Sequence, residues 1–299
     1  MGKSPCFGEG APCYDNVIVR GSPANIDKAT VRGFGDEWAA FDQTSVPAEE
    51  LEQRFHEYFG MFPFHELADA EGFDLGCGSG RWAQFVAPRV RKIHCIDPSA
   101  KALDVSRERL REFSNVEFHL AGSHDNPLPD ASQDFGYSLG VLHHIPNAEE
   151  AMAQCVAKLR PGAPFLVYLY YRFDNRPGWF RVLWRASDLV RRVISRLPFR
   201  FRKVVAEILA VLVYLPLSRS AYLAERLGLD VSNWPLGYYR QYSFYTLRTD
   251  ALDRFGTRLE HRFSRDEIIA MMERSGLEQV RVSEGPPLWV AIGHKRRIA

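Results

Sequence analysis

The sequence predicts an α/β fold: a seven-stranded, mostly parallel sheet with helices on both faces and a helical cap inserted after the fifth strand. Three observations lead to this prediction. Between residues 73 and 171, short apolar segments alternate with helical patterns, and such βαβ units require a parallel sheet. A glycine-rich turn at 74–80 follows the first apolar segment. Residues 172–263, far more than an ordinary connection, separate the fifth segment from the last helical pattern.

Residues 1–65 are predicted to form an N-terminal lid over the binding pocket of the core. The segment begins rich in Gly, Pro and Asp, and the aromatic residues Phe34 and Trp38 then fall close together. Apolar residues at helical spacing predict helices over 49–58 and 61–70. The aromatic side chains either cover a pocket, as functional segments outside the core often do, or pack in the core.

Residues 66–171 are predicted to form most of the α/β core. Apolar runs bounded by turn residues predict strands at 72–76, 92–97, 115–120, 134–140 and 163–171. Helical patterns between these runs predict helices at 80–89, 99–112 and 147–159. Glu149 and Glu150 place acids at the start of the last of these helices, and Pro161 with Gly162 ends it.

Residues 172–263 are predicted to form the helical cap. Between Trp179 and Leu197, apolar residues fall on one side of a helix, and the other side carries a ridge formed by Arg181, Arg185, Arg192 and Arg196. The apolar run 204–217 that follows is too short to span a bilayer and contains Glu207. We interpret this run as a buried cap helix, with a helix lying on a membrane surface as the alternative.

Residues 264–299 are predicted to complete the core. Ser264 and Glu267 have the spacing of a capping box, and Gly276 is placed to end the helix that they begin. Two final strands are expected, at 277–283 and 287–294. These strands would bring the sheet to seven.

Composition indicates a protein of aqueous, reducing surroundings. The 299 residues carry a net charge of +1, which gives no general attraction to nucleic acid or to acidic surfaces. An odd number of cysteines, three of them in predicted core elements, argues against a disulfide framework. The five cysteines are Cys6, Cys13, Cys77, Cys95 and Cys155. The first residues contain no apolar run typical of a secretory signal, so a cytoplasmic location is expected.

The glycine-rich turn, Asp74-Leu75-Gly76-Cys77-Gly78-Ser79-Gly80, indicates what the core binds. Glycines at alternate positions let the backbone turn at positive φ and let a ligand lie against the main chain. A dinucleotide turn has the spacing G-x-G-x-x-G, whereas this turn is G-x-G-x-G with an acid two residues before it. That carboxylate would repel a pyrophosphate but would suit a cationic amino-acid group. A nucleoside that carries an α-amino acid, such as S-adenosylmethionine, is therefore the expected cofactor.

Two further features lie where such a nucleotide-binding fold needs them. Asp97 ends the second predicted strand, at the position that hydrogen-bonds a ribose diol in folds of this kind. The fourth predicted strand ends in the pair His143-His144. With these motifs, residues 70–171 resemble the class I S-adenosylmethionine-dependent methyltransferases, in particular the small-molecule group of ubiquinone-biosynthesis-type enzymes. Residues 264–294 resemble them more weakly.

This resemblance implies a Rossmann-like fold and assigns a cofactor site. Asp74 and the glycines would receive the methionine part of the cofactor, Asp97 its ribose, and Pro98 its adenine. The loop after the third strand departs from the usual Gly-Asp at Ser123, so Asp125 or backbone atoms would meet the adenine amine. The full set of expected cofactor-binding residues is Asp74, Gly76, Cys77, Gly78, Gly80, Asp97, Pro98, Ser123, Asp125 and Leu139.

The catalytic and acceptor-binding candidates follow from position and residue type. His143 or His144 would act as general base, with His143 preferred, because a neutral imidazole there can deprotonate an acceptor. The alternative is that these histidines only pack or cap a turn. Tyr171, after the fifth strand, is the third catalytic candidate. The candidates for binding the acceptor are Phe34, Trp38, Arg172, Tyr239, Arg240 and Tyr242, although the tyrosine–arginine cluster among them suits a cap core equally well.

The sequence thus predicts in-line methyl transfer from S-adenosylmethionine to a small molecule. The apolar cap favours a hydrophobic, lipid-linked or glycosylated acceptor and leaves membrane-surface contact through 179–217 open. The methylated atom also stays open among O, C, N and S. The alternative is a non-catalytic protein that keeps the cofactor fold and binds a membrane or a partner. The glycine spacing counts against a nicotinamide dehydrogenase.

Two other classes of site are not expected. The fourth strand ends in Leu142-His143-His144-Ile145 rather than in the Asn/Asp-Pro-Pro-aromatic motif of enzymes that methylate base amines, so nucleic acid is not predicted as a substrate. No acid pair is placed in the sequence to hold magnesium, so no metal is predicted either.

Overall fold

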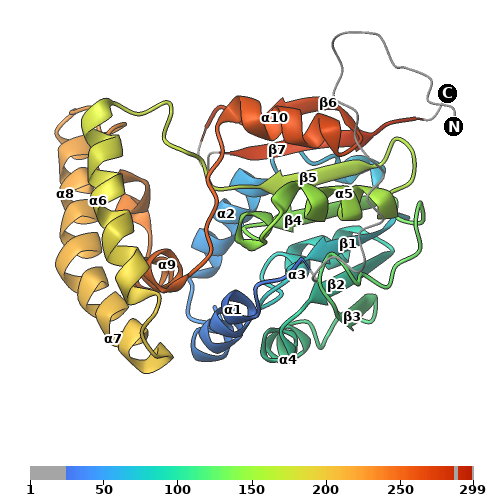
Figure 1. The fold of residues 1–299 in the computed structure, drawn as a ribbon, viewed down its shortest axis with the longest axis horizontal. Helices are drawn as coiled ribbons and strands as arrows, with labels where there is room; N and C mark the ends of the chain where they lie inside the picture. Colours follow the sequence, from blue (N-terminus) through green and yellow to red (C-terminus); the bar gives the residue numbers. More distant parts are fainter. Residues whose placement is uncertain (1–24, 286–288, 298–299) are drawn as a thin grey trace, which may run out of the picture.

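The computed structural model describes residues 25–285 and 289–297, and every structural statement below concerns these residues. One sheet of seven strands runs through them in the order β3-β2-β1-β4-β5-β7-β6 (Figure 1). In chain order the strands are β1 (Glu71–Leu75), β2 (Lys92–Asp97), β3 (Val116–Leu120), β4 (Phe135–Leu139), β5 (Pro164–Tyr168), β6 (Leu277–Val282) and β7 (Val290–Lys295). Strands β1 to β5 pair in parallel, and β7 runs antiparallel to both of its neighbours. The predicted mostly parallel, Rossmann-like sheet is confirmed.

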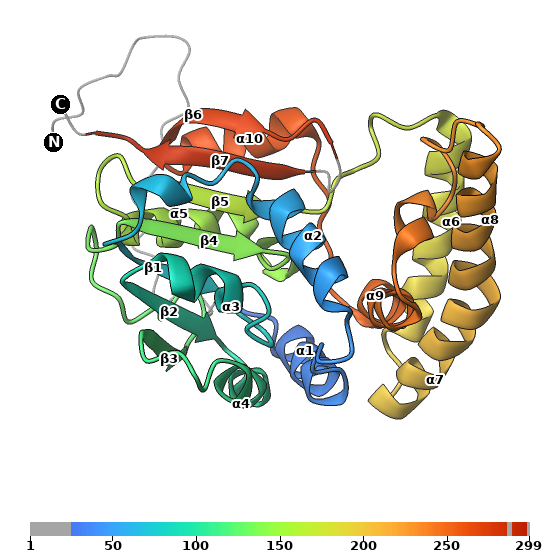
Figure 2. The ribbon, with the colours of Figure 1, turned by 180° about the vertical axis from the view of Figure 1, so that it is seen from behind.

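Helices cover both faces of the sheet. In Figure 1 the front face carries α5 (Ala148–Lys158) and α10 (Arg265–Arg274), and the view from behind in Figure 2 shows α2 (Ala48–Phe59) and α3 (Ala83–Val86) on the other face. Because side chains alternate along a strand, β5 serves both layers. Phe165 packs with Met152 and Ile268 on the first face, and Leu166 belongs to the apolar cluster of the second.

Local sequence features set the helix ends that were predicted. Ser264 accepts a hydrogen bond from Glu267 N (3.2 Å), and the Glu267 carboxylate accepts one from Ser264 N (2.8 Å), so the capping box at the start of α10 is formed. Gly276 follows that helix with φ +96°. Asn147 caps α5 by accepting a hydrogen bond from Glu150 N (3.1 Å).

Two further helices lie near the edge of the sheet where β2 and β3 are. α1 (Lys28–Ala40) begins at Asp27, whose carboxylate accepts a hydrogen bond from Thr30 N (2.6 Å), and it packs against α4 (Ala100–Arg109). The sequence analysis predicted no helix before residue 49, so α1 was missed.

The insertion after β5 forms a separate helical layer at one end of the molecule (Figures 1 and 2). Its elements are α6 (Gly178–Ile194), α7 (Phe199–Leu209), the π-helical turn η4 (Ala210–Tyr214), α8 (Leu215–Arg226), the 3₁₀ helix η5 (Gly237–Gln241) and α9 (Phe244–Gly256). We call this layer the cap. Its two ends meet, because Tyr171 pairs with Phe263 in a parallel bridge and Phe263 N donates a hydrogen bond to Tyr170 O (2.9 Å).

Two predicted helices are wrong in extent. The segment 61–70 contains only the short 3₁₀ helix η1 (Phe64–Glu66), because Pro63 has no N–H to continue a helix and the chain turns to enter β1. The helix expected at 80–89 is reduced to α3 and the 3₁₀ turn η2 (Ala87–Arg89), which contains Pro88.

The interpretation of 204–217 as a buried cap helix is also wrong. Within this segment only Ala206, Ala210 and Tyr214 are buried, while Val204, Ile208, Val211, Leu212 and Val213 are exposed. The reason is that α7, η4 and α8 form one helix, Phe199–Arg226, that packs on the rest of the cap along a single narrow face. By length and composition this helix could cross a membrane. Only 28% of its most apolar window is buried, so it is not an ordinary core helix.

The thiols of the described residues are free, as expected. Cys77, Cys95 and Cys155 are all buried and unpaired. Cys6 and Cys13 lie outside the described residues, as do the first residues of the expected lid.

Candidate functional site

A cavity of about 530 Å³ lies at the carboxyl ends of the parallel strands, between the sheet, α1 and the cap. This is where open α/β sheets bind their ligands. Its volume falls in the range of roughly 300–1,000 Å³ that is common for small-molecule sites. The wall is contributed by the turn after β1, the ends of β2, β4 and β5, α1 and α2, and the cap helices α6, α8 and α9.

The glycine turn after β1 forms one wall of the cavity. Gly76 and Gly78 line it and have φ of +77° and +54°. A Cβ on Gly76 would lie 2.3 Å from a Val141 methyl, and a Cβ on Gly78 would lie 3.0 Å from Trp38 Nε1. Both the positive φ and the lack of room for a Cβ therefore favour glycine at these two positions, as expected.

Asp97 faces the glycine turn from the end of β2. Its carboxylate accepts hydrogen bonds from Gly78 N (3.0 Å) and Ser99 N (2.8 Å). Burial raises the pKa of Asp97 to about 6, although these two bonds work in the opposite direction. Each carboxylate oxygen can accept a further hydrogen bond, so Asp97 can hold a diol from the cavity side.

Asp74 lies beneath the turn rather than on the cavity wall. Burial raises its pKa to about 8, with the neighbouring Tyr137 hydroxyl opposing the shift and the charge of Asp97 adding to it. Its Oδ2 atom is buried and has no hydrogen-bond partner among the described residues. A cationic group brought near the turn would ionise this carboxyl.

Some of the residues expected to hold the cofactor lie on the cavity wall, and others do not. Cys77, Pro98, Ser123 and Leu139 line the cavity. Gly80 does not, because it packs inward, where a Cβ would meet Ser106 Oγ at 2.6 Å. Asp125 also lies off the wall, since its carboxylate accepts a hydrogen bond from Gly122 N (2.6 Å) and closes the loop.

Two serine hydroxyls support the fit of a polar ligand at this end of the cavity. Ser79 Oγ and Ser123 Oγ are buried, their residues line the cavity, and neither oxygen has a hydrogen-bond partner within the described ranges. An unsatisfied buried hydroxyl is costly, and a ligand that hydrogen-bonds it removes that cost. With the glycines and Asp97, these groups fit a nucleoside that carries an amino acid.

The two histidines after β4 have different environments. His144 lines the cavity, donates a hydrogen bond from Nδ1 to Leu259 O (2.7 Å), and packs against Phe34 with ring centroids 4.9 Å apart. His143 is fully buried, is not on the cavity wall, and stacks on Tyr170 at 3.8 Å. Burial lowers the pKa of both histidines. The preference for His143 is therefore not supported by its position.

The tyrosines at the end of β5 all reach the cavity. Strict alternation predicts Tyr171 on the face opposite Tyr168 and Tyr170, yet all three line the wall because the strand ends at Tyr168. Tyr170 donates a hydrogen bond to Asp253 Oδ2 (2.6 Å). The Tyr171 ring packs on Phe173, with centroids 4.3 Å apart.

Of the residues expected to bind the acceptor, three line the cavity and three do not. Phe34, Trp38 and Tyr239 are on the wall. The other three are engaged elsewhere: Arg172 pairs with Glu267 (2.8 Å), Arg240 pairs with Glu225 (2.8 Å), and Tyr242 donates a hydrogen bond to Glu57 (3.1 Å). Their side chains support the cap rather than contact a ligand.

Sequence reasoning missed a group of charged residues on the cavity wall. Arg54 of α2 lies 3.8 Å from Asp250 of α9, and Arg81 and Asp253 line the same region. Burial raises the pKa of Asp250, with the charges of Arg54 and Arg81 opposing the shift. The only signal was the spacing of Asp250 and Asp253, which places both acids on one face of a helix. Acids and arginines thus form a polar part of the cavity wall.

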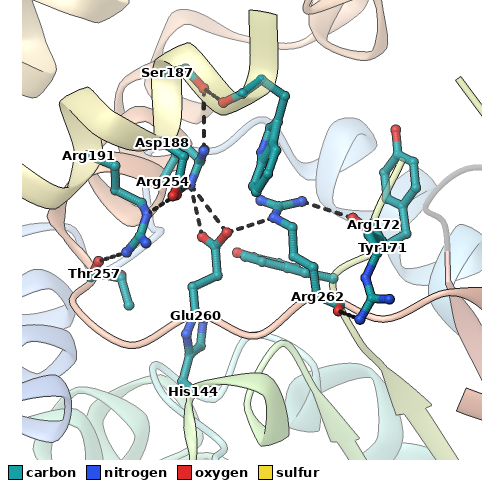
Figure 3. Close-up of polar contacts among 12 residues, drawn as sticks. His144, Tyr171, Arg172, Ser187, Asp188, Arg191, Arg254, Thr257, Glu260 and Arg262 are labelled. Carbon is teal, nitrogen blue, oxygen red and sulfur yellow. Dashed lines mark hydrogen bonds and ion pairs between the residues drawn. The ribbon is translucent and has the colours of Figure 1, made fainter. Parts of the chain in front are cut away.

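A second polar group ties α6 to the chain that follows α9 and forms another part of the wall. Figure 3 shows Glu260 between Arg254 (3.2 Å) and Arg262 (2.6 Å), with Asp188 and Arg191 of α6 beside them. Although burial opposes it, the charges of Arg262 and Arg254 hold the pKa of Glu260 below its ordinary value. Arg254 and Arg262 line the cavity, so this network positions two cations there.

One group of metal-ligating side chains lies away from this cavity. The ligand atoms of His94, Glu117 and His119 fall within 4.8 Å of one another on β2 and β3. Lys92 pairs with Glu117 at 2.6 Å, and His94 hydrogen-bonds Glu71 at 2.8 Å. None of these residues touches the cavity, and the expectation that the site uses no metal stays a prediction.

Comparison with known proteins identifies the core. Residues 73–167 match the model of a methyltransferase domain. A probable S-adenosylmethionine-dependent methyltransferase of Mycolicibacterium smegmatis is 29% identical over 125 residues, which are 42% of this chain and 48% of that protein. A demethylmenaquinone methyltransferase of Tropheryma whipplei is 26% identical over 197 residues, 65% of this chain and 81% of that protein. The chain therefore spans about half the length of the first relative.

The fold is also similar to that of a solved structure. A chain of the complex between the Haloferax volcanii Trm112 methyltransferase activator and a methyltransferase aligns with a TM-score of 0.51 at 13% identity, over 90% of this chain and 99% of that one. At this identity the match shows the fold alone. Together with the domain match, it confirms the resemblance that the motifs predict: residues 73–167 match a methyltransferase domain, and the chain is similar to S-adenosylmethionine-dependent methyltransferases.

Proposed function

We propose that this chain is a methyltransferase that transfers the methyl group of S-adenosylmethionine to a small, amphiphilic acceptor held beneath the cap. The observation that carries the proposal is one continuous cavity. It begins at the glycine turn and Asp97 and continues past His144 to the cap helices. The methyltransferase domain of residues 73–167 and its relatives support this reading.

The cofactor would lie against the turn after β1. Gly76, Gly78 and Ser79 would hold its methionine part, with Asp74 beneath them as the counter-charge for the ammonium group. Asp97 would bind the ribose, and Pro98 and Ser123 would meet the adenine. When bound, S-adenosylmethionine supplies an electrophilic methyl group on a sulfonium.

The protein's part in the reaction is to align the acceptor and, where the acceptor is an alcohol or phenol, to remove its proton. We propose His144 for that role rather than His143. If Nδ1–H donates to Leu259 O, then Nε2 carries the lone pair, and Nε2 has no partner among the described residues. Because burial lowers its pKa, His144 is neutral near pH 7 and able to accept a proton.

The proposed role of His144 as general base can be tested by measuring its protonation state. Nitrogen-edited NMR of the protein should show His144 as the neutral Nδ1–H tautomer down to pH values below 6.5, the ordinary pKa of histidine. Assignment comes from the His144→Gln variant, and His56, whose side chain is 67% exposed, serves as the solvent-exposed reference signal. An imidazole that is already charged near pH 7 would exclude His144 as the base.

The cavity wall also indicates the acceptor's chemistry. Its polar part contains Arg54, Asp250 and Asp253, and the cap contributes Leu217 and Trp184. The Trp184 Nε1–H is buried without a partner in the described part of the chain, so it can bind an acceptor oxygen. We propose a hydrophobic, lipid-linked or glycosylated acceptor, as the name of the demethylmenaquinone relative also suggests.

The same proposal includes a location in the cytoplasm and contact with a membrane surface through residues 179–217. The free, buried thiols of Cys77, Cys95 and Cys155 suit a reducing compartment. Phe34 and Trp38, both on the wall, support a lid role for the N-terminal segment that ends near residue 65.

The first experiment is calorimetric titration of the purified chain with S-adenosylmethionine and S-adenosylhomocysteine. We expect micromolar affinity, about −8 kcal/mol, and its loss in Asp97→Ala. Asp125→Ala is the matched control, because this acid lies off the cavity wall, and it should bind almost as the parent does. A folded parent chain that binds neither nucleoside would contradict the proposal and favour a non-catalytic, membrane-binding or partner-binding protein.

A further inference from the structure

The exposed apolar side chains of this protein are concentrated on the cap. Among the described residues, every large apolar side chain that is exposed lies between Trp179 and Leu229, except Leu120 and Phe244. The members on the cap helices are Trp179, Val182, Leu183, Leu189, Val190, Val193, Leu197, Phe201, Val204, Ile208, Val211, Leu212, Val213, Tyr222 and Leu223. We call this set the outer face. Concentration of this kind marks an interaction surface.

Helix α6 buries two charged residues against the protein and turns its apolar side outward. Its inward side contains Asp188 and Arg191, which form a buried ion pair at 2.7 Å. Its outward side contains Leu189 and Val193, which are 64% and 65% exposed. This inversion is a specific feature of the helix, because its sequence is strongly amphipathic and an ordinary cap would bury the apolar side.

The long helix Phe199–Arg226 adds a second apolar row. Both helices lie at the end of the molecule farthest from the sheet (Figures 1 and 2). The inner row of the long helix, Ala206, Ala210 and Ala221, is buried. Glu207 pairs with Arg248 of α9 (2.9 Å), and Arg219 donates a hydrogen bond to Arg240 O (2.7 Å). These ties hold the helix in the cap, so it can lie on a membrane without crossing it.

The cavity reaches this outer face. Leu183 of α6 and Val213 of the long helix both line the cavity, and they are 50% and 38% exposed. They belong to the two helices that form the outer face, so the cavity wall and the outer face share these side chains.

The charges around the outer face select its partner. Arg181, Arg185, Arg196 and Arg200 are exposed, and none of them has an ion-pair partner among the described residues. Between Trp179 and Val204 the only acidic residue is Asp188, which is buried. A second copy of the chain would bring the same arginines, while the acids of the long helix, Glu207 and Glu225, are already paired with Arg248 and Arg240. Anionic lipid head groups match the arginines, and acyl chains match the apolar rows.

We propose that the outer face docks on an anionic bilayer and sets this shared part of the cavity wall at the lipid surface, so that the acceptor enters from the membrane. This inference rests on the proposed function for the identity of the acceptor, but the docking itself does not need it. It makes the acceptor a membrane-dissolved amphiphile, whose polar end reaches the charged part of the cavity and whose apolar part lies beside Leu183 and Val213.

The test is flotation of the full chain with vesicles of phosphatidylcholine alone and of an equal mixture of phosphatidylcholine and phosphatidylglycerol. We expect binding to the mixed vesicles, weakened by salt, and little binding to the neutral ones. Leu189→Glu/Val193→Glu/Leu212→Glu should weaken binding at least about tenfold, because it puts charges into the apolar rows. Leu120→Glu is the matched control, since Leu120 is 61% exposed but lies on β3.

Two further measurements keep the test decisive if the triple glutamate variant does not fold. Arg181→Gln/Arg185→Gln/Arg196→Gln should lose most binding to the mixed vesicles and most of the salt dependence. Brominated lipids should quench tryptophan emission in the parent chain, and Trp179→Phe should remove most of that quenching, because Trp179 is an exposed outer-face residue.

Three results would overturn the proposal. In the first, the parent chain does not bind mixed vesicles. In the second, it binds them but the outer-face variants bind equally well. In the third, the parent chain forms a dimer that the glutamate variant does not form, and the parent does not bind vesicles. Titration with S-adenosylhomocysteine without vesicles separates the two proposals. If the nucleoside binds and vesicles do not, only the docking fails, and the reverse result removes the proposed methyl transfer but leaves the docking.

Discussion

In β5 of the core, Phe165, Leu166 and Val167 are completely buried, whereas in α6 of the cap the apolar residues Leu189 and Val193 are exposed. The buried residues of α6 include an aspartate and an arginine. The core therefore follows the usual relation between hydrophobicity and burial, and the cap reverses it on one helix. What differs is the surroundings: the core packs on both sides of a sheet, while the cap borders a charged cavity on one side.

The same contrast is visible in how the two regions bury a carboxyl group. In the core, Asp74 is buried with one unpartnered oxygen, and burial raises its pKa to about 8. In the cap, Glu260 is buried between Arg254 and Arg262, whose charges keep its pKa below the ordinary value despite burial. Burial alone therefore does not decide the charge of a carboxyl, because the neighbouring groups can reverse its effect.

The largest effect is expected from Asp74→Asn in the cofactor-free protein. The unfolded carboxyl loses its proton near pH 4, but the folded one keeps it until about pH 8, so stability falls as pH rises through this window. A shift of about four units corresponds to about 5 kcal/mol, an upper bound. The variant should gain up to that amount at pH 8 and almost nothing at pH 4, as measured by urea unfolding.

The control for this prediction is Asp125→Asn, which changes an exposed carboxyl and should leave the pH dependence as it is. Asp74→Asn should also bind S-adenosylmethionine more weakly, because the amide cannot become the counter-charge of an ammonium group. If the variant is destabilised equally at pH 4 and pH 8, the carboxyl is not protonated in the folded protein and the contrast with Glu260 disappears.

Glu260→Ala should cost about 3–5 kcal/mol, because it leaves Arg254 and Arg262 buried without their common partner. Here the pH dependence has the opposite sign to that of Asp74. The contribution of the parent Glu260 is present above its unfolded pKa, near 4.5, and is lost as pH falls through the lower folded value. Urea unfolding of parent and variant between pH 7 and pH 4 should therefore show the difference shrinking toward the acid end.

The exposed pair Arg274 and Glu149 offers the comparison for that variant. Its bidentate contacts are 2.8 and 2.9 Å long, yet both side chains are in solvent. Glu149→Ala should therefore be close to neutral. Equal costs for Glu260→Ala and Glu149→Ala would mean that the cap network is no more buried in solution than a surface pair.

Two leucines allow the apolar side of the comparison to be measured directly. Leu166→Ala removes a buried side chain from β5 and should cost about 2–5 kcal/mol. Leu212→Ala, in the outer face, should change stability by no more than about 0.5 kcal/mol, because that side chain is 69% exposed. Urea unfolding of both variants in one buffer gives the two values. A large cost at Leu212 would show that the outer face is covered in solution.

The core was readable from the sequence because each of its patterns has one physical meaning. Apolar runs bounded by turns became strands, and Ser264 with Glu267 became a capping box. The glycine turn and Asp97 were found for the same reason, since backbone conformation and close approach leave few other residues that fit. Position along a strand could not, however, decide which histidine after β4 reaches the cavity.

The cap was less readable because amphipathicity does not say which side faces the protein. The spacing of apolar residues in α6 was recognised correctly. Only the packing of α6 on α9 and the contacts around Glu260 show that Arg191 and Asp188 are buried. Arg54 and Asp250 could not be paired from the sequence, since they are far apart along the chain and meet only in the folded protein. Arg172, Arg240 and Tyr242 were of the right type for a ligand site but found partners within the protein.

The smallest predicted effect asks whether local rules also differ between the two regions. Ser264 caps α10 of the core and Ser243 caps α9 of the cap, by accepting hydrogen bonds from Glu267 N (3.2 Å) and Thr246 N (3.3 Å). Replacement of either serine by alanine should cost about 1 kcal/mol. The cost at Ser264 should be slightly higher, because Glu267 returns a second bond to Ser264 N. Urea unfolding that finds similar costs would confine the reversal in the cap to its burial pattern, since helix ends then obey the same rule in both regions. A cost near zero at Ser243 would instead extend the difference to the helix ends, because α9 would then be held only by its packing.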